Sequence, residues 1–111
     1  EAERGLTRLA FAGGELVVPA VPRAVGDRLR LRISSRDIIL AARRPEAISI
    51  RNILAARVVA VTEAAGAAFV TVALGPTVLH ARITADAVHD LHLAPGDPVF
   101  VLVKSVAIDR A

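Results

Sequence analysis

Glycine and proline divide this chain into short apolar segments, and this spacing limits the folds that it can form. The turn signals lie about eight to twelve residues apart, which is typical of all-β domains. The segments between them are rich in valine, isoleucine and leucine. We expect strands over residues 6–11, 16–18, 28–33, 37–41, 48–61, 69–74, 78–83, 99–103 and 106–109. Many short strands joined by close turns predict a small β-barrel or β-sandwich.

Local signals predict two hairpins and one short helix. Gly13-Gly14 and Gly75-Pro76 each separate two apolar segments, as in β-hairpins. Residues 85–91 carry apolar side chains at helical spacing, with Thr84 in place to cap the helix and Asp86 in its first turn. We therefore expect one or two helical turns there.

The chain also contains an internal repeat. Residues 25–38 match residues 95–108 at a constant offset of 70. The coinciding residues are Gly26 and Gly96, Asp27 and Asp97, Ser35 and Ser105, and Ile38 and Ile108. The first copy has no room for the helical turn. We therefore expect two related β-lobes, a truncated one over residues 1–44 and a complete one over residues 45–111.

Composition excludes several classes of protein. Cysteine is absent, which rules out disulfides and thiolate metal sites. His89 and His92 are three residues apart, but no third metal ligand is evident. No apolar run approaches the ~20 residues that span a bilayer. A phosphate-binding Gly-x-x-x-x-Gly-Lys-Ser/Thr loop and a recognisable catalytic set are also absent, so we predict no enzymatic activity for this segment. Because methionine is absent, we expect a processed product or a fragment of a longer polypeptide.

The basic residues do not resemble those of a nucleic-acid-binding surface. The net charge is +3, and eleven acidic residues are interleaved with fourteen basic ones. Arg28, Arg30 and Arg32 alternate with apolar residues, which predicts a half-buried strand with a solvated basic face. Single-strand binders add stacking aromatics, whereas this chain has three phenylalanines and no Tyr or Trp. We therefore predict no nucleic-acid partner.

Two polar pairs at the ends of apolar strands indicate an anion site. Lys104, the only lysine of the chain, follows one apolar strand together with Ser105. A compact point charge beside a small hydroxyl suits a small anion. Ser49 and Arg51 form a second pair at the start of another apolar strand. Simpler interpretations exist: Lys104 extends into solvent, Ser49 ends a turn, and Arg51 pairs with a carboxylate such as that of Glu46.

Several motifs resemble the Mop family of molybdopterin-binding domains, also called TOBE domains. They are Ser-Ile-Arg-Asn at 49–52, Ala-Arg-Ile-Thr at 81–84, Leu-His-Leu-Ala-Pro-Gly at 91–96 and Val-Lys-Ser-Val at 103–106. The similarity extends to residues 32–38 and Pro45, and it is most specific over 48–109. The chain is most similar to the C-terminal regulatory domain of the ATPase subunits of molybdate ABC importers. This resemblance implies an all-β fold, with a small OB-like (oligonucleotide-binding-like) five-stranded barrel and one short helix, preceded by a truncated related lobe.

The resemblance also implies which residues bind an oxyanion at an interface between subunits. These residues are Ser49, Arg51, Asn52, Thr84, Lys104 and Ser105. The chain departs from the family at Ala87, where a serine is frequent, and at His92, where a glycine is usual. Taken alone, Thr84 is better explained by helix capping.

The chemistry of these residues suits molybdate or tungstate. Each is a tetrahedral dianion whose four oxygens only accept hydrogen bonds, so a site needs converging donors and no carboxylates. The hydroxyls of Ser49, Thr84 and Ser105 are donors, nearby backbone N–H groups add more, and Lys104 supplies fixed charge. The smaller sulfate should fit poorly. We predict no cofactor beyond this oxyanion ligand.

The expected function is that of an oxyanion-sensing regulatory domain of an ABC importer ATPase subunit. Its predicted partners are a second copy of itself in a homodimer, the ATPase domain of the parent chain and, through it, a membrane permease. The predicted location is the cytoplasm, at the inner face of the cell membrane. The alternative is a purely structural dimerisation domain of an ABC ATPase subunit without a functional anion site.

Overall fold

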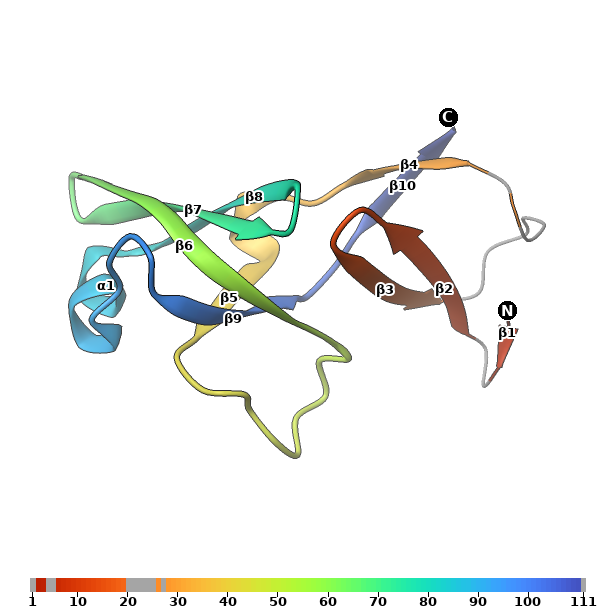
Figure 1. The fold of residues 1–111 in the computed structure, drawn as a ribbon, viewed down its shortest axis with the longest axis horizontal. Helices are drawn as coiled ribbons and strands as arrows, with labels where there is room; N and C mark the ends of the chain where they lie inside the picture. The colour runs from red at the N-terminus through yellow and green to blue at the C-terminus, as the bar shows by residue number, and fades with distance from the viewer. Residues whose placement is uncertain (1, 4–5, 20–25, 27, 111) are drawn as a thin grey trace.

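The computed structural model describes residues 2–3, 6–19, 26 and 28–110, which form three antiparallel sheets (Figure 1). The elements are β1 (Ala2–Glu3), β2 (Leu6–Phe11), β3 (Gly14–Pro19), β4 (Leu29–Arg32), the 3₁₀ turn η1 (Ser35–Asp37), β5 (Ile38–Ala41), β6 (Asn52–Ala64), β7 (Ala67–Leu74), β8 (Thr77–Thr84), α1 (Ala85–Leu91), β9 (Pro98–Val103) and β10 (Ala107–Arg110). The strand orders are β1-β2-β3, β10-β4 and β5-β9-β6-β7-β8. The five-stranded sheet and α1 fill one half of the molecule, and the two small sheets fill the other (Figure 1).

Strand β6 organises the five-stranded sheet. Its first half, Asn52 to Arg57, pairs with β9, and its second half, from Arg57 onward, pairs with β7. A register shift between Val58 and Ala60 marks a bulge, which bends the strand. The sheet curls until its outer strands β5 and β8 contact each other. The result is a partly open barrel of the OB type.

The core of this barrel comes from inward-facing apolar residues of its strands, and β7 shows the alternation most clearly. In β7, Ala68, Val70, Val72 and Leu74 point inward and are almost completely buried, whereas Phe69 points outward and is exposed. Val88 of α1 packs on the same cluster. Each large aliphatic side chain buried in this way stabilises the fold by about 1.5–3 kcal/mol.

The two sequence repeats exchange their last strands. Strands β4 and β9 hold equivalent positions in the repeat, and so do β5 and β10. However, β5 pairs with β9, with Ile38 opposite Val103, and β10 pairs with β4, with Ile108 opposite Leu31. If the two pairings had the same register, the offset of 70 would place Ile108 opposite Ile33, two residues from its actual partner Leu31. The two pairings therefore differ in register. Each of the two predicted lobes thus contributes its last strand to a sheet of the other.

The β2–β3 hairpin is attached to the barrel through its turn. Gly13 lies so close to the β7–β8 turn that a Cβ on it would clash with the carbonyl oxygen of Leu74. The Thr77 hydroxyl donates a hydrogen bond to the carbonyl oxygen of Ala12. Leu16 of β3 is buried in the core cluster of the barrel. Close backbone contact and one inserted side chain therefore hold the hairpin in place.

The predicted all-β fold with one short helix is confirmed, as are both hairpins and the helix with its Thr84 cap. One prediction was wrong: the strand expected over 48–61 begins at Asn52, and the preceding residues form a loop. Lys104, which would stand opposite Arg51, donates its N–H to the Asp37 carbonyl oxygen instead. Residues 48–51 therefore have no strand partner on β9. No helix among the described residues is long and apolar enough to cross a membrane.

Candidate functional site

Most of the predicted site residues lie at one end of the β6–β9 pair. Asn52 is opposite Val103, so Arg51 and Lys104 directly flank a paired position on neighbouring strands. Both side chains are exposed. Ser49 lies three residues before Asn52 in the preceding loop and is exposed as well. This end of the barrel therefore presents two cations and a hydroxyl to solvent.

Asn52 itself faces the N-terminal hairpin. Its side-chain amide donates to the carbonyl oxygen of Val17 at 2.8 Å, and its side-chain oxygen accepts from the N–H of Val17 at 2.6 Å. The side-chain amide thus makes the same pair of hydrogen bonds that a backbone residue makes in an antiparallel sheet, and it joins β6 to β3. Both polar atoms of this predicted anion-binding residue are therefore engaged in a contact between two parts of the fold.

Ser105 lines an open pocket of about 600 Å³ where the two exchanged segments meet. The same pocket is lined by Ser34, Asp37 and Arg32. Ser34 accepts a hydrogen bond from the N–H of Arg36 at 3.3 Å. A carboxylate therefore lies among the hydroxyls, which disfavours a free dianion in this pocket unless neighbouring cations outweigh the Asp37 charge.

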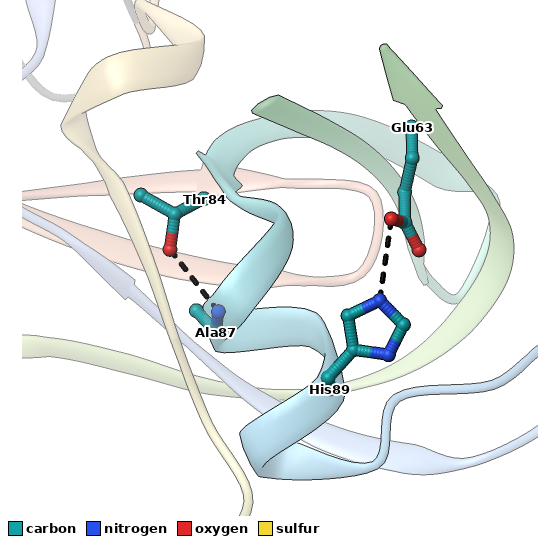
Figure 2. Close-up of polar contacts among 4 residues, drawn as sticks. All are labelled: Glu63, Thr84, Ala87 and His89. Atoms are coloured by element: carbon teal, nitrogen blue, oxygen red, sulfur yellow. Dashed lines mark hydrogen bonds and ion pairs between the residues drawn. The ribbon is translucent and has the colours of Figure 1, made fainter. Parts of the chain in front are cut away.

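Thr84 is at the other end of β6. It is opposite Ala67, which follows the turn from β6, and it lines a separate pocket of about 360 Å³. Its hydroxyl oxygen accepts the N–H of Ala87 at 3.1 Å and so caps α1 (Figure 2). Because a hydroxyl both donates and accepts, its proton is left to donate to another group.

The six predicted residues therefore form two groups. Ser49, Arg51, Asn52, Lys104 and Ser105 gather where β6 begins and β9 ends, whereas Thr84 belongs to the end where β6 meets β7. No hydrogen bond or ion pair recorded for the described residues joins Thr84 to the other five.

Each of the three histidines contacts a neighbouring side chain or ends the helix. His89 lies 3.3 Å from the carboxylate of Glu63 across the barrel end (Figure 2). His92 ends α1 in the left-handed conformation, with φ of 54°, which explains why glycine suits this position. His80 is exposed and lies 3.1 Å from the Thr71 hydroxyl. Within the described residues, no three potential ligands gather into a metal site.

Sequence reasoning missed two cations beside Thr84. Arg36 and Arg82 both line its pocket. Arg82 precedes Thr84 by two residues on the same strand, so the period-2 rule places them on one face and was a usable signal. Arg36 had no such signal, because it reaches the pocket only through the packing of η1 against β8.

Comparison with known proteins supports the resemblance. The TOBE domain model matches residues 48–109. The molybdenum import ATP-binding protein ModC of Paramagnetospirillum magneticum is 43% identical over 107 residues, which cover 96% of this chain and 30% of that protein. ModC 1 of Azotobacter vinelandii is 47% identical over 105 residues, covering 93% and 29%. The chain thus spans about three tenths of the length of these relatives.

A solved structure has the same architecture. The crystal structure of the cytoplasmic molybdate-binding protein ModG, with molybdate bound, superposes with a TM-score of 0.82 at 25% identity. The alignment covers 94% of this chain and 82% of that one, so it includes the small sheets as well as the barrel. Together with the family match over more than half of its residues, this likeness shows that the chain belongs to the TOBE domain family.

Proposed function

We propose that this chain is a regulatory module that binds molybdate or tungstate between two copies of itself. The observation that carries the proposal is the division of the six candidate residues into two groups at the two ends of β6. Neither group surrounds an anion alone. Two chains that bring the Lys104 end of one to the Thr84 end of the other would complete the site.

The charges support this arrangement. Arg51 and Lys104 provide two exposed cations at one end of the barrel, and Ser49 provides a hydroxyl. The Thr84 pocket offers a further hydroxyl, and none of the described residues that line it is acidic. A dianion held between them keeps its charge compensated while its oxygens accept hydrogen bonds from both chains.

Symmetry sets the number of sites. In a two-fold dimer, a contact between one region of the first chain and another region of the second occurs twice. The proposal therefore predicts two equivalent anions per dimer. Because each anion bridges two chains, its binding favours one arrangement of those chains over others.

The relatives supply the setting. They are molybdenum import ATP-binding proteins, so the parent protein is proposed to carry an ATPase domain and to work with a membrane permease. The module itself would lie on the cytoplasmic side of that membrane. Occupancy of the module would then report the oxyanion concentration to the transporter.

Calorimetric titration of the full chain with molybdate, tungstate and sulfate tests the proposal. We expect micromolar binding of molybdate and tungstate at one anion per chain, and sulfate at least about tenfold weaker. Lys104→Gln should weaken molybdate binding by about tenfold or more, because a charged hydrogen-bond donor is lost. Arg8→Ala, which breaks an exposed ion pair with Glu15 on the hairpin, is the control. No binding, or equal affinity for all three anions, would contradict the proposal.

A second candidate is a dimerisation domain without a working anion site. Two observations favour it: Ala87 lacks a hydroxyl, and the Asn52 amide makes two hydrogen bonds to Val17. Analytical ultracentrifugation with and without molybdate separates the two candidates. A dimer whose dissociation constant is unaffected by millimolar molybdate would favour the structural role.

A further inference from the structure

Two arginines converge on the pocket that contains Thr84. The pocket is lined by Arg36, Arg82 and Thr84 together with the turn between β6 and β7. None of the described residues that line it is a carboxylate, in contrast to the pocket of Ser105, which includes Asp37. The wall of the Thr84 pocket thus includes two arginines and one threonine, and none of its described residues is acidic.

Arg82 is held in place by an exposed aromatic ring. It lies opposite Phe69 on the neighbouring strand, and its guanidinium carbon is 5.9 Å from the centre of the phenyl ring. Stacking of this kind restricts a long side chain at a small energetic gain. Phe69 is 44% exposed, so its ring is open to contact from the Arg82 side chain. Its position is explained if it orients Arg82.

Arg36 reaches the same pocket from a different element. It lies in η1, whose first turn is fixed by the Ser34 side chain and by the Asp37 N–H donating to the Ser34 carbonyl oxygen at 2.9 Å. The turn packs against β8. No ion pair is recorded between either Arg36 or Arg82 and a carboxylate of the described residues. Both charges are therefore available to an external anion.

The start of α1 adds no side-chain hydroxyl beside Thr84. Ala87 carries no hydroxyl, and its N–H is already used by Thr84. Guanidinium groups are suited to supply donors here, because each presents paired N–H groups that match two oxygens of a tetrahedral oxyanion. They add positive charge as well, which a hydroxyl does not.

We infer that Arg36 and Arg82 are the cationic half of the oxyanion site on the Thr84 side and make it selective for doubly charged anions. This inference rests on the proposed function and adds its charge selectivity. With Lys104 and Arg51 of the other copy, the anion lies between cations on both sides. A singly charged tetrahedral anion of similar size gains less from these charges, so the arginines separate ligands by charge rather than by shape.

The test compares molybdate with perrhenate, a tetrahedral oxyanion of similar size and single charge, by calorimetry of the full chain at constant ionic strength. Arg36→Ala and Arg82→Ala should each weaken molybdate binding by about tenfold, as expected for a lost charged hydrogen bond. The loss of perrhenate affinity should be at most about threefold, so the molybdate-to-perrhenate affinity ratio falls. Phe69→Leu, which removes the stacking partner of Arg82, should lower the ratio by a smaller factor.

Arg8→Ala is the matched control, because it removes the same charge from the hairpin, where Arg8 pairs with Glu15 at 3.8 Å. Thermal melting confirms that each variant is folded. If the unmodified chain binds neither anion, the proposed function fails and this inference with it. If the chain binds molybdate and both arginine variants keep the original ratio, this inference alone is overturned. Loss of the dimer in these variants at an unchanged ratio would instead assign the arginines to protein contact, and would also overturn it.

Discussion

The five-stranded barrel and the two small sheets are stabilised in different ways. Nearly all buried hydrophobic residues of the described chain belong to the barrel and its helix; only Leu16 and Val18 come from the small sheets. The β2–β3 hairpin instead depends on close backbone approach at Gly13, on the inserted Leu16 side chain and on the Asn52 amide. Apolar burial therefore fixes the barrel, whereas a few specific contacts fix the hairpin to it.

This difference bears on the candidate site. Arg51 and Lys104 flank the position where Asn52 connects the barrel to the hairpin. The Arg51 and Lys104 end of the candidate site thus lies at the junction between the apolar barrel core and a hairpin that is held by fewer contacts. Ligand binding and hairpin docking are expected to influence each other there.

The largest effect should come from placing a charge in the barrel core. Val70→Asp puts a carboxylate at a side chain that is 0% exposed, and an uncompensated buried charge costs about 4 kcal/mol or more. Because domains of this size are stable by about 5–15 kcal/mol, much of that stability would be lost. Urea denaturation followed by circular dichroism measures the change.

Val78→Asp is the control for this variant, since Val78 is 51% exposed on the next strand. It should change the free energy of unfolding by about 0.5 kcal/mol or less. The small sheets should unfold together with the barrel in Val70→Asp, because they have little core of their own. If the hairpin stayed protected from hydrogen exchange while the barrel unfolded, the hairpin would be stable without the barrel, which contradicts this interpretation.

A smaller and local effect is expected from Gly13→Ala. Gly13 has φ of +118°, and an added Cβ would clash with the Leu74 carbonyl oxygen. We expect the hairpin to dock less favourably by about 2–3 kcal/mol, from backbone strain and displacement. Hydrogen exchange should quicken in β2 and β3 and stay unchanged in β7.

Gly66→Ala separates strain from contact. Gly66 also has a positive φ, +82°, but nothing lies within 4 Å of an added Cβ. It should cost about 1 kcal/mol and leave the exchange of the hairpin unaffected. Equal effects of the two substitutions on β2 and β3 would show that close approach at Gly13 does not hold the hairpin.

The sequence predicted the local elements well because their signals are local. Alternating apolar residues located the β7–β8 hairpin, and Thr84 with Asp86 located the helix. The repeat also matched local backbone conformation at one pair of positions: Gly26 and Gly96 adopt nearly the same positive φ, 97° and 93°. Each of these features depends on a few neighbouring residues.

Pairing between distant segments was not predictable in the same way. Nothing in the composition of β5 or β10 specifies that they exchange partners between the repeats, because any apolar strand fits either edge. The role of Asn52 was missed for a similar reason: its partner, Val17, is 35 residues away. For the candidate site, the motifs supply residue types whose role in anion binding stays a prediction, whereas the packing that brings Arg36 to the Thr84 pocket had no local signal.

The smallest effect concerns Asn52 and decides whether it positions the fold or binds the ligand. Asn52→Leu keeps the size of the side chain and removes both hydrogen bonds to Val17. It should make hairpin docking less favourable by about 1–2 kcal/mol. Asn52→Asp keeps the acceptor for the Val17 N–H but places a carboxylate against the Val17 carbonyl oxygen, so it should loosen the hairpin by a similar amount.

The two substitutions differ in what they do to an anion. If Asn52 only positions the hairpin, Asn52→Leu should quicken exchange in β3 and weaken molybdate binding slightly, by the same factor for molybdate and perrhenate. Asn52→Asp adds negative charge beside Arg51 and Lys104, so it should weaken molybdate more than perrhenate. If Asn52→Leu instead abolished molybdate binding without altering exchange in β3, Asn52 would be a direct ligand, and its amide would have to leave Val17 when the anion binds. The hairpin would then be released by the ligand rather than held beside it.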